Sequence, residues 1–279
     1  MNQKTLFVLS ASLLAQLTCA HSAVISYNWD YYGTIPTNST SLAGVVSAAN
    51  WNNSYDGTGA STTPPTVGSP ELNLIDDSGD GTTMDIHFSG TAQWHLAPFW
   101  NGAPQDVDGT YNKSLLKGYV DMVGGNPVTI SLAEIPYAQY DIYIYMSSDT
   151  AGREGYVTDT ASTFFFSTYG SDAISGDNAA FIQATETGDF GTNAAATYAR
   201  FSNLTGSSQS LSVFAAGNGG IAGIQVVQVR AVRRASRRSW NAGPVPSPPL
   251  SLRFQTDPAA GSSLGGPAVL YFDCFPCFT

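Results

Sequence analysis

Residues 197–206, 210–215 and 222–227 read TYARFSNLTG, SLSVFA and AGIQVV, and these three runs decide the fold class. Apolar residues in the runs alternate with polar or small ones, and glycine, asparagine and serine separate one run from the next. A period of two indicates β-strands, and short strands joined by such residues are typical of antiparallel sheets. The stretch therefore predicts three consecutive antiparallel strands.

The same pattern continues toward the N-terminus. Residues 140–146 are apolar or aromatic at nearly every position, which predicts a central strand covered on both faces. Counting all such runs gives roughly ten strands, and many short strands with glycine-rich turns are typical of a sandwich. We therefore expect an all-β domain over residues 24–229, an antiparallel β-sandwich or jelly roll. Besides these runs we expect one short helix at 113–117 and strands at 24–27, 72–75, 84–88, 128–132, 163–166 and 181–185.

The two ends of the chain differ from this domain. Residues 1–23 combine a lysine, an apolar run and a few small residues, which is the pattern of a secretory signal peptide. Residues 230–279 hold six of the eleven basic residues and a proline-rich segment, so we expect a disordered tail. No apolar stretch is long enough to cross a membrane. We therefore expect a secreted protein, outside the cell or at its surface, without a stable membrane span.

The expected domain is strongly acidic and contains no cysteine. Between residues 24 and 229 the chain has four basic and nineteen acidic residues, a net charge of −15. Such a surface repels nucleic acid and anionic membranes, so we expect neither as a partner. Without disulfides, the stability of the domain has to come from burial, from hydrogen-bonded sheets and, if one binds, from a cation.

Residues 76–81, DDSGDG, place oxygen-bearing side chains at Asp76, Ser78 and Asp80, ahead of a glycine. Calcium loops use this spacing because alternate side chains converge on one ion, so calcium is the one cofactor that the sequence suggests. The similarity to an EF-hand ends there, because the twelfth position is His87 and not glutamate. An aspartate- and glycine-rich hairpin turn explains the same residues and is the commoner use of the pattern.

Large aromatic residues gather in two stretches, one with Trp94 and Trp100 and one with Trp29 and Tyr31. Exposed rings can form the apolar wall of a sugar site, while nearby polar side chains bind the hydroxyl groups. Arg153, in the loop after the expected central strand, could hold a carboxylate or hydroxyl of a ligand. These five are the candidate glycan-binding residues. The alternatives are core packing for the rings and a structural ion pair for the arginine.

Catalytic motifs are missing from the sequence. It lacks the histidine spacing of metalloproteases. Its G-x-S-x-G match, GSSLG at 261–265, lies in the expected disordered tail, without the strand and helix that the elbow of hydrolases requires. A glycoside hydrolase needs two opposed carboxylates, and nothing in the sequence selects such a pair. We therefore expect a non-catalytic protein that binds a polysaccharide or cell-surface glycan, or that belongs to an extracellular matrix. The alternatives are a glycan-active hydrolase with an unidentified carboxylate pair and a purely structural surface protein.

Seven blocks of the chain suggest a family. The first is AGVVSAANWNN at 43–53, and the others are KGYVD at 117–121, YDIYIY at 140–145, GREG at 152–155, FIQAT at 181–185, YARFSNL at 198–204 and IAGIQVV at 221–227. In content and order they resemble secreted β-sandwich proteins of planctomycete- and verrucomicrobia-like bacteria, which commonly end in a PEP-CTERM sorting signal. The resemblance implies export and association with a surface or matrix. It implies no established activity, so it transfers no catalytic residue.

The end of the chain departs from this family's pattern, because Pro-Glu-Pro and the apolar helix of the sorting signal are missing. Codons for residues 245–252, VPSPPLSL, can read Pro-Glu-Pro-Ala-Thr-Leu-Ala in another frame. Our hypothesis is a shifted reading frame between Val229 and Val245. Resequencing the gene tests it, and another frame without an apolar helix and a basic end would exclude it.

Overall fold

The computed structural model describes residues 22–29, 35–54, 70–89, 92–95, 105–122, 126–217 and 219–230; for 92–95 and 121 it describes the backbone alone. The chain divides into two units, residues 1–232 and 233–279. The first unit contains all the described residues. Most of the expected signal peptide, and all of the expected tail except Arg230, lie outside them.

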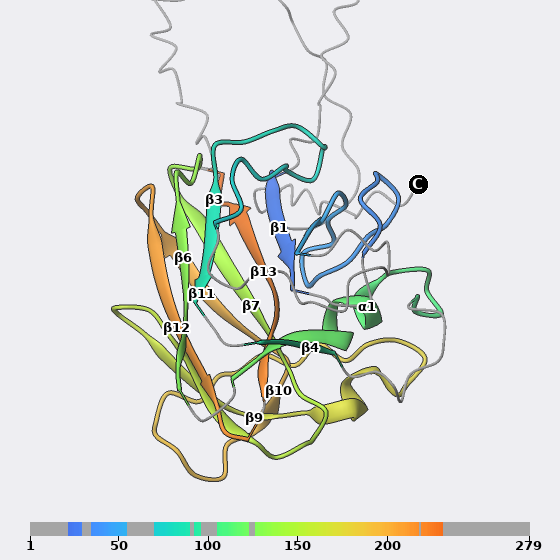
Figure 1. Cartoon of the computed structure of the whole chain (residues 1–279), viewed down its shortest axis with the longest axis vertical. Helices are drawn as coiled ribbons and strands as arrows, with labels where there is room; N and C mark the ends of the chain where they lie inside the picture. Colours follow the sequence, from blue (N-terminus) through green and yellow to red (C-terminus); the bar gives the residue numbers. More distant parts are fainter. Residues whose placement is uncertain are drawn as a thin grey trace, which may run out of the picture. The chain divides into compact units, whose positions relative to one another are not determined.

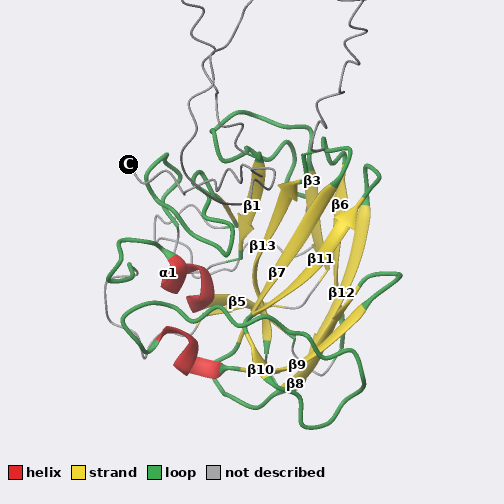
Figure 2. Ribbon diagram, turned by 180° about the vertical axis from the view of Figure 1, so that it is seen from behind, coloured by secondary structure: helices red, strands yellow, loops and turns green. Residues whose placement is uncertain are grey.

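The first unit consists of two β-sheets (Figure 1, Figure 2). Within the described residues one sheet has seven strands. They are β1 (Val24–Asn28), β2 (Asn52–Asn53), β4 (Ala92–His95), β5 (Gly118–Asp121), β7 (Tyr140–Ser147), β11 (Tyr198–Leu204) and β13 (Gly220–Gln228). The spatial order is β11-β7-β13-β1-β2, with β5 also paired to β13, and β4 to β5.

The second sheet has six strands among the described residues, in the order β10-β9-β8-β12-β6-β3. They are β3 (Asp85–Ser89), β6 (Val128–Ala133), β8 (Glu154–Thr158), β9 (Thr163–Thr168), β10 (Ala195–Ala196) and β12 (Gln209–Ala215). Two short helices complete the described elements, α1 (Asn112–Lys117) and the 3-10 helix η2 (Gly170–Ile174).

The predicted all-β fold is confirmed, with differences in detail. The pairings are antiparallel except for β1 with β2 and β9 with β10, which are parallel over two residues each, so both sheets are mixed. Strands of two residues are too short to show a period, which is one reason why the predicted number of strands was low. Two predicted strands were wrong, because residues 72–75 and 181–185 form only isolated bridges, such as Ile75 with Gly81 and Gln183 with Tyr198.

The two sheets share one hydrophobic core. Inward-facing side chains from both form a single buried cluster, to which β7 contributes Ile142, Ile144 and Met146. The opposite sheet contributes apolar residues at every second position: Ile86, Phe88, Val128, Ile130, Leu132, Val157, Phe166, Leu211, Val213 and Ala215. All eight residues of β7 are buried, so the prediction of a central strand covered on both faces is confirmed.

A second buried cluster covers the outer face of the seven-stranded sheet. Tyr143 and Tyr145 of β7 belong to it, together with Trp51, Leu115 and Ile174 from the loop 35–54, α1 and η2. In Figure 1 the loop 35–54, drawn in blue, and α1 lie on the side of β1 and β13 that faces away from β6 and β12. This loop and the two short helices form the outer layer of the sandwich.

The side-chain amide of Gln225 lies beneath the outer layer and is fully buried. Its Oε1 accepts hydrogen bonds from the Tyr145 hydroxyl and from the backbone N–H of Val46. Its Nε2 donates to the carbonyl oxygen of Val46 at 2.8 Å and to the Ser26 hydroxyl at 3.2 Å. A buried amide is costly unless its hydrogen bonds are made. The two contacts with Val46 tie the loop to the sheet, and those with Tyr145 and Ser26 join β13 to β7 and β1.

Gly44 shows how closely the loop approaches Gln225. Its φ is +97°, and a Cβ built there would lie 2.5 Å from the Gln225 Oε1. Only glycine adopts such a φ readily and leaves room for the amide. The side chain of Asn52 holds the same loop to β1, since its Nδ2 donates to the Ser26 carbonyl oxygen at 2.9 Å. The loop is therefore fixed in place by hydrogen bonds as well as by apolar contact.

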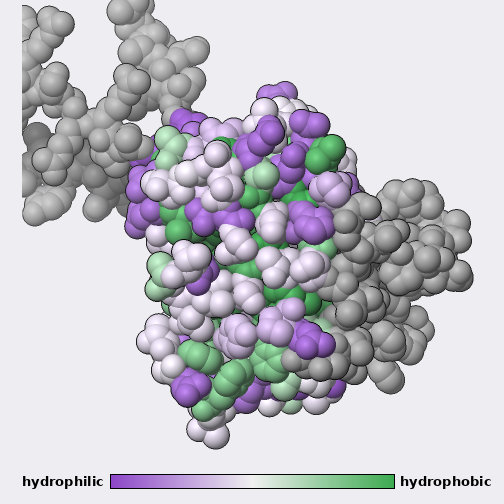
Figure 3. Space-filling model, turned by 60° about the vertical axis from the view of Figure 1, so that its left-hand side comes forward, coloured by the Kyte–Doolittle hydropathy of each residue, from purple (hydrophilic) through white to green (hydrophobic). Residues whose placement is uncertain are grey.

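The outer face of the six-stranded sheet is more exposed than that of the seven-stranded sheet. Figure 3 views the molecule from this side. The outward-facing residues of β3, β6, β8 and β12 are all half-buried or exposed. Of the two sheet faces that point away from the core, this one is therefore accessible to a ligand.

Replacing Ile144 by alanine should lower the free energy of unfolding by about 2–5 kcal/mol, the usual cost of a large-to-small change in a packed core. Equilibrium urea denaturation of parent and variant measures the difference. Val107→Ala is the control, because Val107 is 76% exposed and surface substitutions usually change stability by less than about 0.5 kcal/mol. A cost below about 1 kcal/mol for Ile144→Ala, small against the core range, would contradict the two-sheet packing.

Candidate functional site

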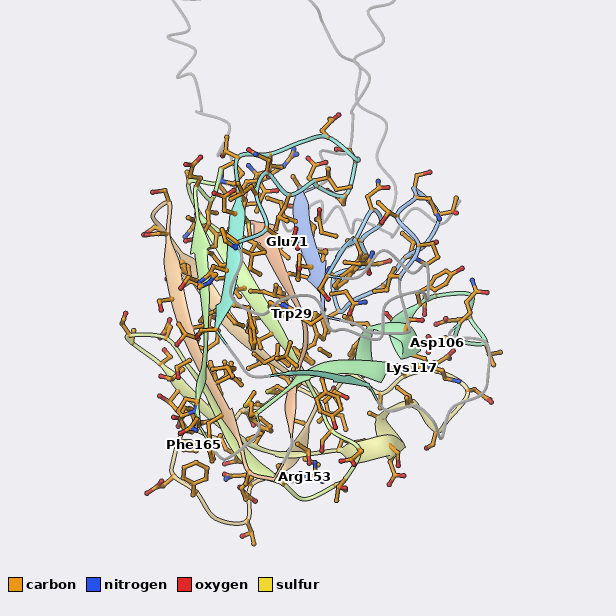
Figure 4. The ribbon with its side chains drawn as sticks, viewed as in Figure 1. Trp29, Glu71, Asp106, Lys117, Arg153 and Phe165 are labelled. Carbon is orange, nitrogen blue, oxygen red and sulfur yellow. The ribbon has the colours of Figure 1, made fainter. Side chains whose placement is uncertain are left out.

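Trp29, a candidate glycan-binding residue, lies in the core. Its side chain is 3% exposed, and its ring packs against Tyr27 at 5.1 Å and Phe88 at 5.5 Å between ring centroids. Figure 4 shows Trp29 in the interior of the sandwich. A ring buried in this way cannot stack on a sugar, so the prediction for Trp29 was wrong. Rings fill a core well because they bury a large apolar area, which explains the position.

The structure says less about the other three aromatic candidates. Tyr31 and Trp100 lie outside the described residues. The backbone of Trp94 belongs to β4, where it pairs with Tyr119 of β5, and its side chain is not described. A glycan role for these three residues stays a prediction.

Arg153 forms the structural ion pair that was the alternative to ligand binding. Its guanidinium lies 2.8 Å from the Asp149 carboxylate and donates to the hydroxyls of Ser148 and Thr150 at 3.0 and 3.1 Å. These partners belong to the segment that joins β7 to β8 at the lower end of the sandwich in Figure 4. The ion pair and hydrogen bonds of Arg153 therefore stabilise the conformation of this segment.

The DDSGDG segment forms a turn. One oxygen of Asp76, Oδ1, accepts hydrogen bonds from the backbone N–H and hydroxyl of Ser78 and from the backbone N–H of Asp80. Gly79 has a φ of +88°. An aspartate that binds the backbone two residues on is a standard turn device. Among the described residues, no group of three or more histidine, cysteine, aspartate or glutamate side chains is placed to hold a metal ion.

The two buried carboxylates in the described part of the chain are used by the fold. Asp106, 4% exposed, accepts hydrogen bonds from the backbone N–H groups of Lys113 and Ala179. Asp141, 5% exposed, pairs with the Arg200 guanidinium at 2.6 Å. Each carboxylate therefore holds neighbouring segments together.

A group of rings lies on the outer face of the six-stranded sheet, and we call it the aromatic cluster: Tyr156, Phe165, Phe190 and Phe214. In the sheet register Phe214 of β12 stands opposite Tyr156 of β8, which stands opposite Phe165 of β9. Their strand neighbours Val213, Val157 and Phe166 point into the core, so these three rings point outward. Alternation along three adjacent strands thus produces a row of rings across the sheet.

Phe190 is the exposed member of the aromatic cluster. Its side chain is 49% exposed, and its ring lies 5.8 Å from Tyr156, 5.5 Å from Phe165 and 5.7 Å from Phe214. The angles between the ring planes are 67°, 75° and 87°. Edge-to-face contacts of this kind are favourable beyond the area that they bury. Three of them hold one half-exposed ring in a fixed orientation.

The segment that carries Phe190 is tied to the sheet on both sides. The backbone N–H of Phe165 donates to the carbonyl oxygen of Glu186 at 2.8 Å. The Asn193 amide donates to the Glu154 carboxylate at 2.6 Å and to the Asp189 carbonyl oxygen at 3.3 Å. These contacts fix the ends of an exposed segment and so preserve the position of the ring between them.

A row of hydroxyl-bearing residues runs beside the rings, and we call it the hydroxyl row: Ser89, Thr129, Ser212, Thr158 and Thr163. The sheet register places each opposite the next, across β3, β6, β12, β8 and β9. On β12, β8 and β9 the hydroxyl residue lies two positions from a ring of the cluster. The two rows are therefore adjacent on the same face, about 7 Å apart along the strands.

Positively charged residues are absent from the described strands that form this face. None of the six strands of this sheet contains lysine or arginine. In Figure 3 hydrophobic residues gather toward the lower end of this side, below a paler and more polar region. The arrangement joins apolar rings to uncharged groups that can donate and accept hydrogen bonds.

Sequence reasoning missed the aromatic cluster. Residues 154–158 show only a short alternation and were not predicted as a strand, and Phe190 lies outside every predicted strand. One signal was present, because Phe214 is out of phase with the core residues Leu211 and Val213 of the same run. Pairing that outward ring with others required the register of the sheet.

Comparison with known protein families, with curated proteins and with solved structures found no match. The resemblance drawn from the seven sequence blocks therefore stays a prediction. In the part of the chain that the structure describes, no helix has the length and apolar character needed to cross a bilayer.

Replacing Asp76 by alanine should lower the free energy of unfolding by about 1–3 kcal/mol, because three donors lose their shared acceptor. Asp80→Ala is the control, since Asp80 contributes its backbone N–H and carbonyl to the turn and alanine keeps both. Millimolar calcium should leave the melting temperature of the parent unchanged, whereas an ion bound only to the folded state would raise it. A calcium-dependent rise that Asp80→Ala abolishes would replace the turn interpretation by a calcium site.

Proposed function

We propose that this protein is a secreted, non-catalytic β-sandwich that binds carbohydrate through the aromatic cluster and the hydroxyl row. The observation that carries the proposal is Phe190, a half-exposed ring held in place by three further rings on an open sheet face. Sugar sites combine apolar or aromatic surface with a few polar groups that fix the ligand. Both kinds of group are adjacent here.

The fixed position of Phe190 supports binding as well as stability. Binding costs less when the groups that make the contact are already ordered, because little side-chain freedom is then lost. A single exposed ring on an unsupported loop would lose that advantage. The contacts of Phe190 with Tyr156, Phe165 and Phe214 provide the order before any ligand arrives.

The hydroxyl row supports the same proposal. Each serine or threonine hydroxyl has one donor and two acceptor positions, as a sugar hydroxyl has. Thr158 and Thr163 already share a hydrogen bond of 2.7 Å, which leaves acceptor capacity on both. Secretion, proposed on the signal-like N-terminus, would bring this face to extracellular polysaccharides or cell-surface glycans.

The test is a glycan array followed by titration calorimetry with the full chain. Phe190→Ala should weaken binding about tenfold or more, which corresponds to about 1.4 kcal/mol. Leu72→Ala is the control, because Leu72 is another large exposed hydrophobic residue, 59% exposed, outside the cluster, and its loss should leave binding unchanged. Tyr156→Phe keeps the ring and removes only the hydroxyl, so it should keep most of the affinity.

Three results would contradict the proposal. The parent protein could bind no glycan on the array. Phe190→Ala could bind as tightly as the parent, which would leave Phe190 the structural role of anchoring its loop. Sedimentation could also show self-association that Phe190→Ala abolishes, which would identify the cluster as an interface between copies of the chain.

A further inference from the structure

We infer that the site takes an uncharged polysaccharide chain that lies across the strands of the six-stranded sheet, and that it rejects acidic polysaccharides. The inference rests on the proposed function and adds the class and orientation of the ligand. It follows from the direction of the two rows and from the charges around them.

The direction comes from the register. Both rows consist of residues that stand opposite one another on neighbouring strands, so both run perpendicular to the strands. Neighbouring strands are about 4.8 Å apart, so the five residues of the hydroxyl row span about 19 Å and the three sheet rings about 10 Å. A single sugar covers only part of that length. A chain of several sugars can contact the rings along one side and the hydroxyls along the other.

The hydroxyl row matches an uncharged chain. Ser212 and Thr129 are half-buried in the middle of the row, on neighbouring strands. Thr158, next in the row, donates within the β8–β9 turn to the Ser162 carbonyl oxygen at 3.0 Å or pairs with Thr163. These groups can exchange hydrogen bonds with sugar hydroxyls, and they bring no charge with them.

In the part of the chain that the structure describes, acidic residues flank the rings. Glu154 lies two residues from Tyr156 on the same face of β8. The backbone of Glu186 forms a β-bridge with that of Phe165, and Asp189 directly precedes Phe190 in the chain. The nearest guanidinium in sequence, Arg153, is paired with Asp149.

A uronate or sulfate group would therefore lose water without gaining a cationic partner, which is costly. An uncharged chain has no such cost. The negative charges therefore disfavour acidic polysaccharides and allow uncharged ones to bind.

Affinity electrophoresis of the full chain tests this inference. Gels that contain soluble β-glucan or galactomannan are compared with gels that contain polygalacturonate or dextran sulfate. Neutral polymers should retard the protein, and acidic ones should bind at least about tenfold more weakly. The comparison is repeated with calorimetry at about 1 M salt, where the Debye length is about 3 Å and the overall negative charge is screened. The rejection of acidic chains should persist there.

Two variants examine the hydroxyl row. Ser212→Ala together with Thr129→Val should weaken binding of the neutral chain about threefold to tenfold, since each lost hydrogen bond is worth about 1 kcal/mol or less. Ser210→Lys places an ammonium group beside the row at an exposed position. It should raise the affinity for the acidic chain about tenfold and leave that for the neutral chain nearly unchanged.

The outcomes separate the inference from the proposed function. Equal affinity for acidic and neutral chains, or a monosaccharide that binds as tightly as a long oligosaccharide, would overturn the inference and leave glycan binding intact. A protein that no polymer retards, with Phe190→Ala indistinguishable from the parent, would overturn the proposed function and the inference with it.

Discussion

The buried pair of strands β7 and β13 is the constraint on which the rest of the structure depends. Eight of the nine residues of β13 and all eight of β7 are buried, so apolar material has to cover both faces of the sheet that they share. The six-stranded sheet covers one face. The outer layer covers the other, and it has little regular structure, so hydrogen bonds to buried polar groups have to hold it. Gln225 provides two of them, both to the backbone of Val46.

This constraint also decides where a ligand can bind. Because both faces of the seven-stranded sheet are covered around β7 and β13, the face left open is the outer face of the six-stranded sheet. Side chains on that face do not fill the main core, so packing does not require them to be apolar. The rings at Tyr156, Phe165 and Phe214 and the half-exposed Phe190 are therefore not needed to close the main core, which supports the proposal that they serve binding.

The sequence predicted what depends on local pattern and missed what depends on register. The nearly continuous apolar and aromatic run at 140–146 predicted the doubly covered central strand correctly, and the runs at 210–215 and 222–227 form most of β12 and β13. The prediction that Trp29 binds a glycan was wrong, because composition cannot distinguish a buried ring from an exposed one. The aromatic cluster was missed because it joins β8, β9 and β12, whose order in the sheet no local pattern reveals.

Three blocks of the suggested family, 43–53, 140–145 and 221–227, meet at Gln225 in the structure. The spacing of the blocks in the sequence does not show this contact.

A double-mutant cycle on Gln225 and Tyr145, which both hydrogen-bond to the backbone of the loop 35–54, tests most directly whether buried hydrogen bonds hold the outer layer. Burial raises the pKa of Tyr145, so its hydroxyl stays protonated and can donate. Gln225→Leu should lower the free energy of unfolding by about 2–4 kcal/mol through the partners left without hydrogen bonds, and Tyr145→Phe by less. Urea denaturation of both single variants and the double variant should reveal a coupling of about 0.5–3 kcal/mol. A Gln225→Leu variant as stable as the parent, with additive effects in the cycle, would contradict the account.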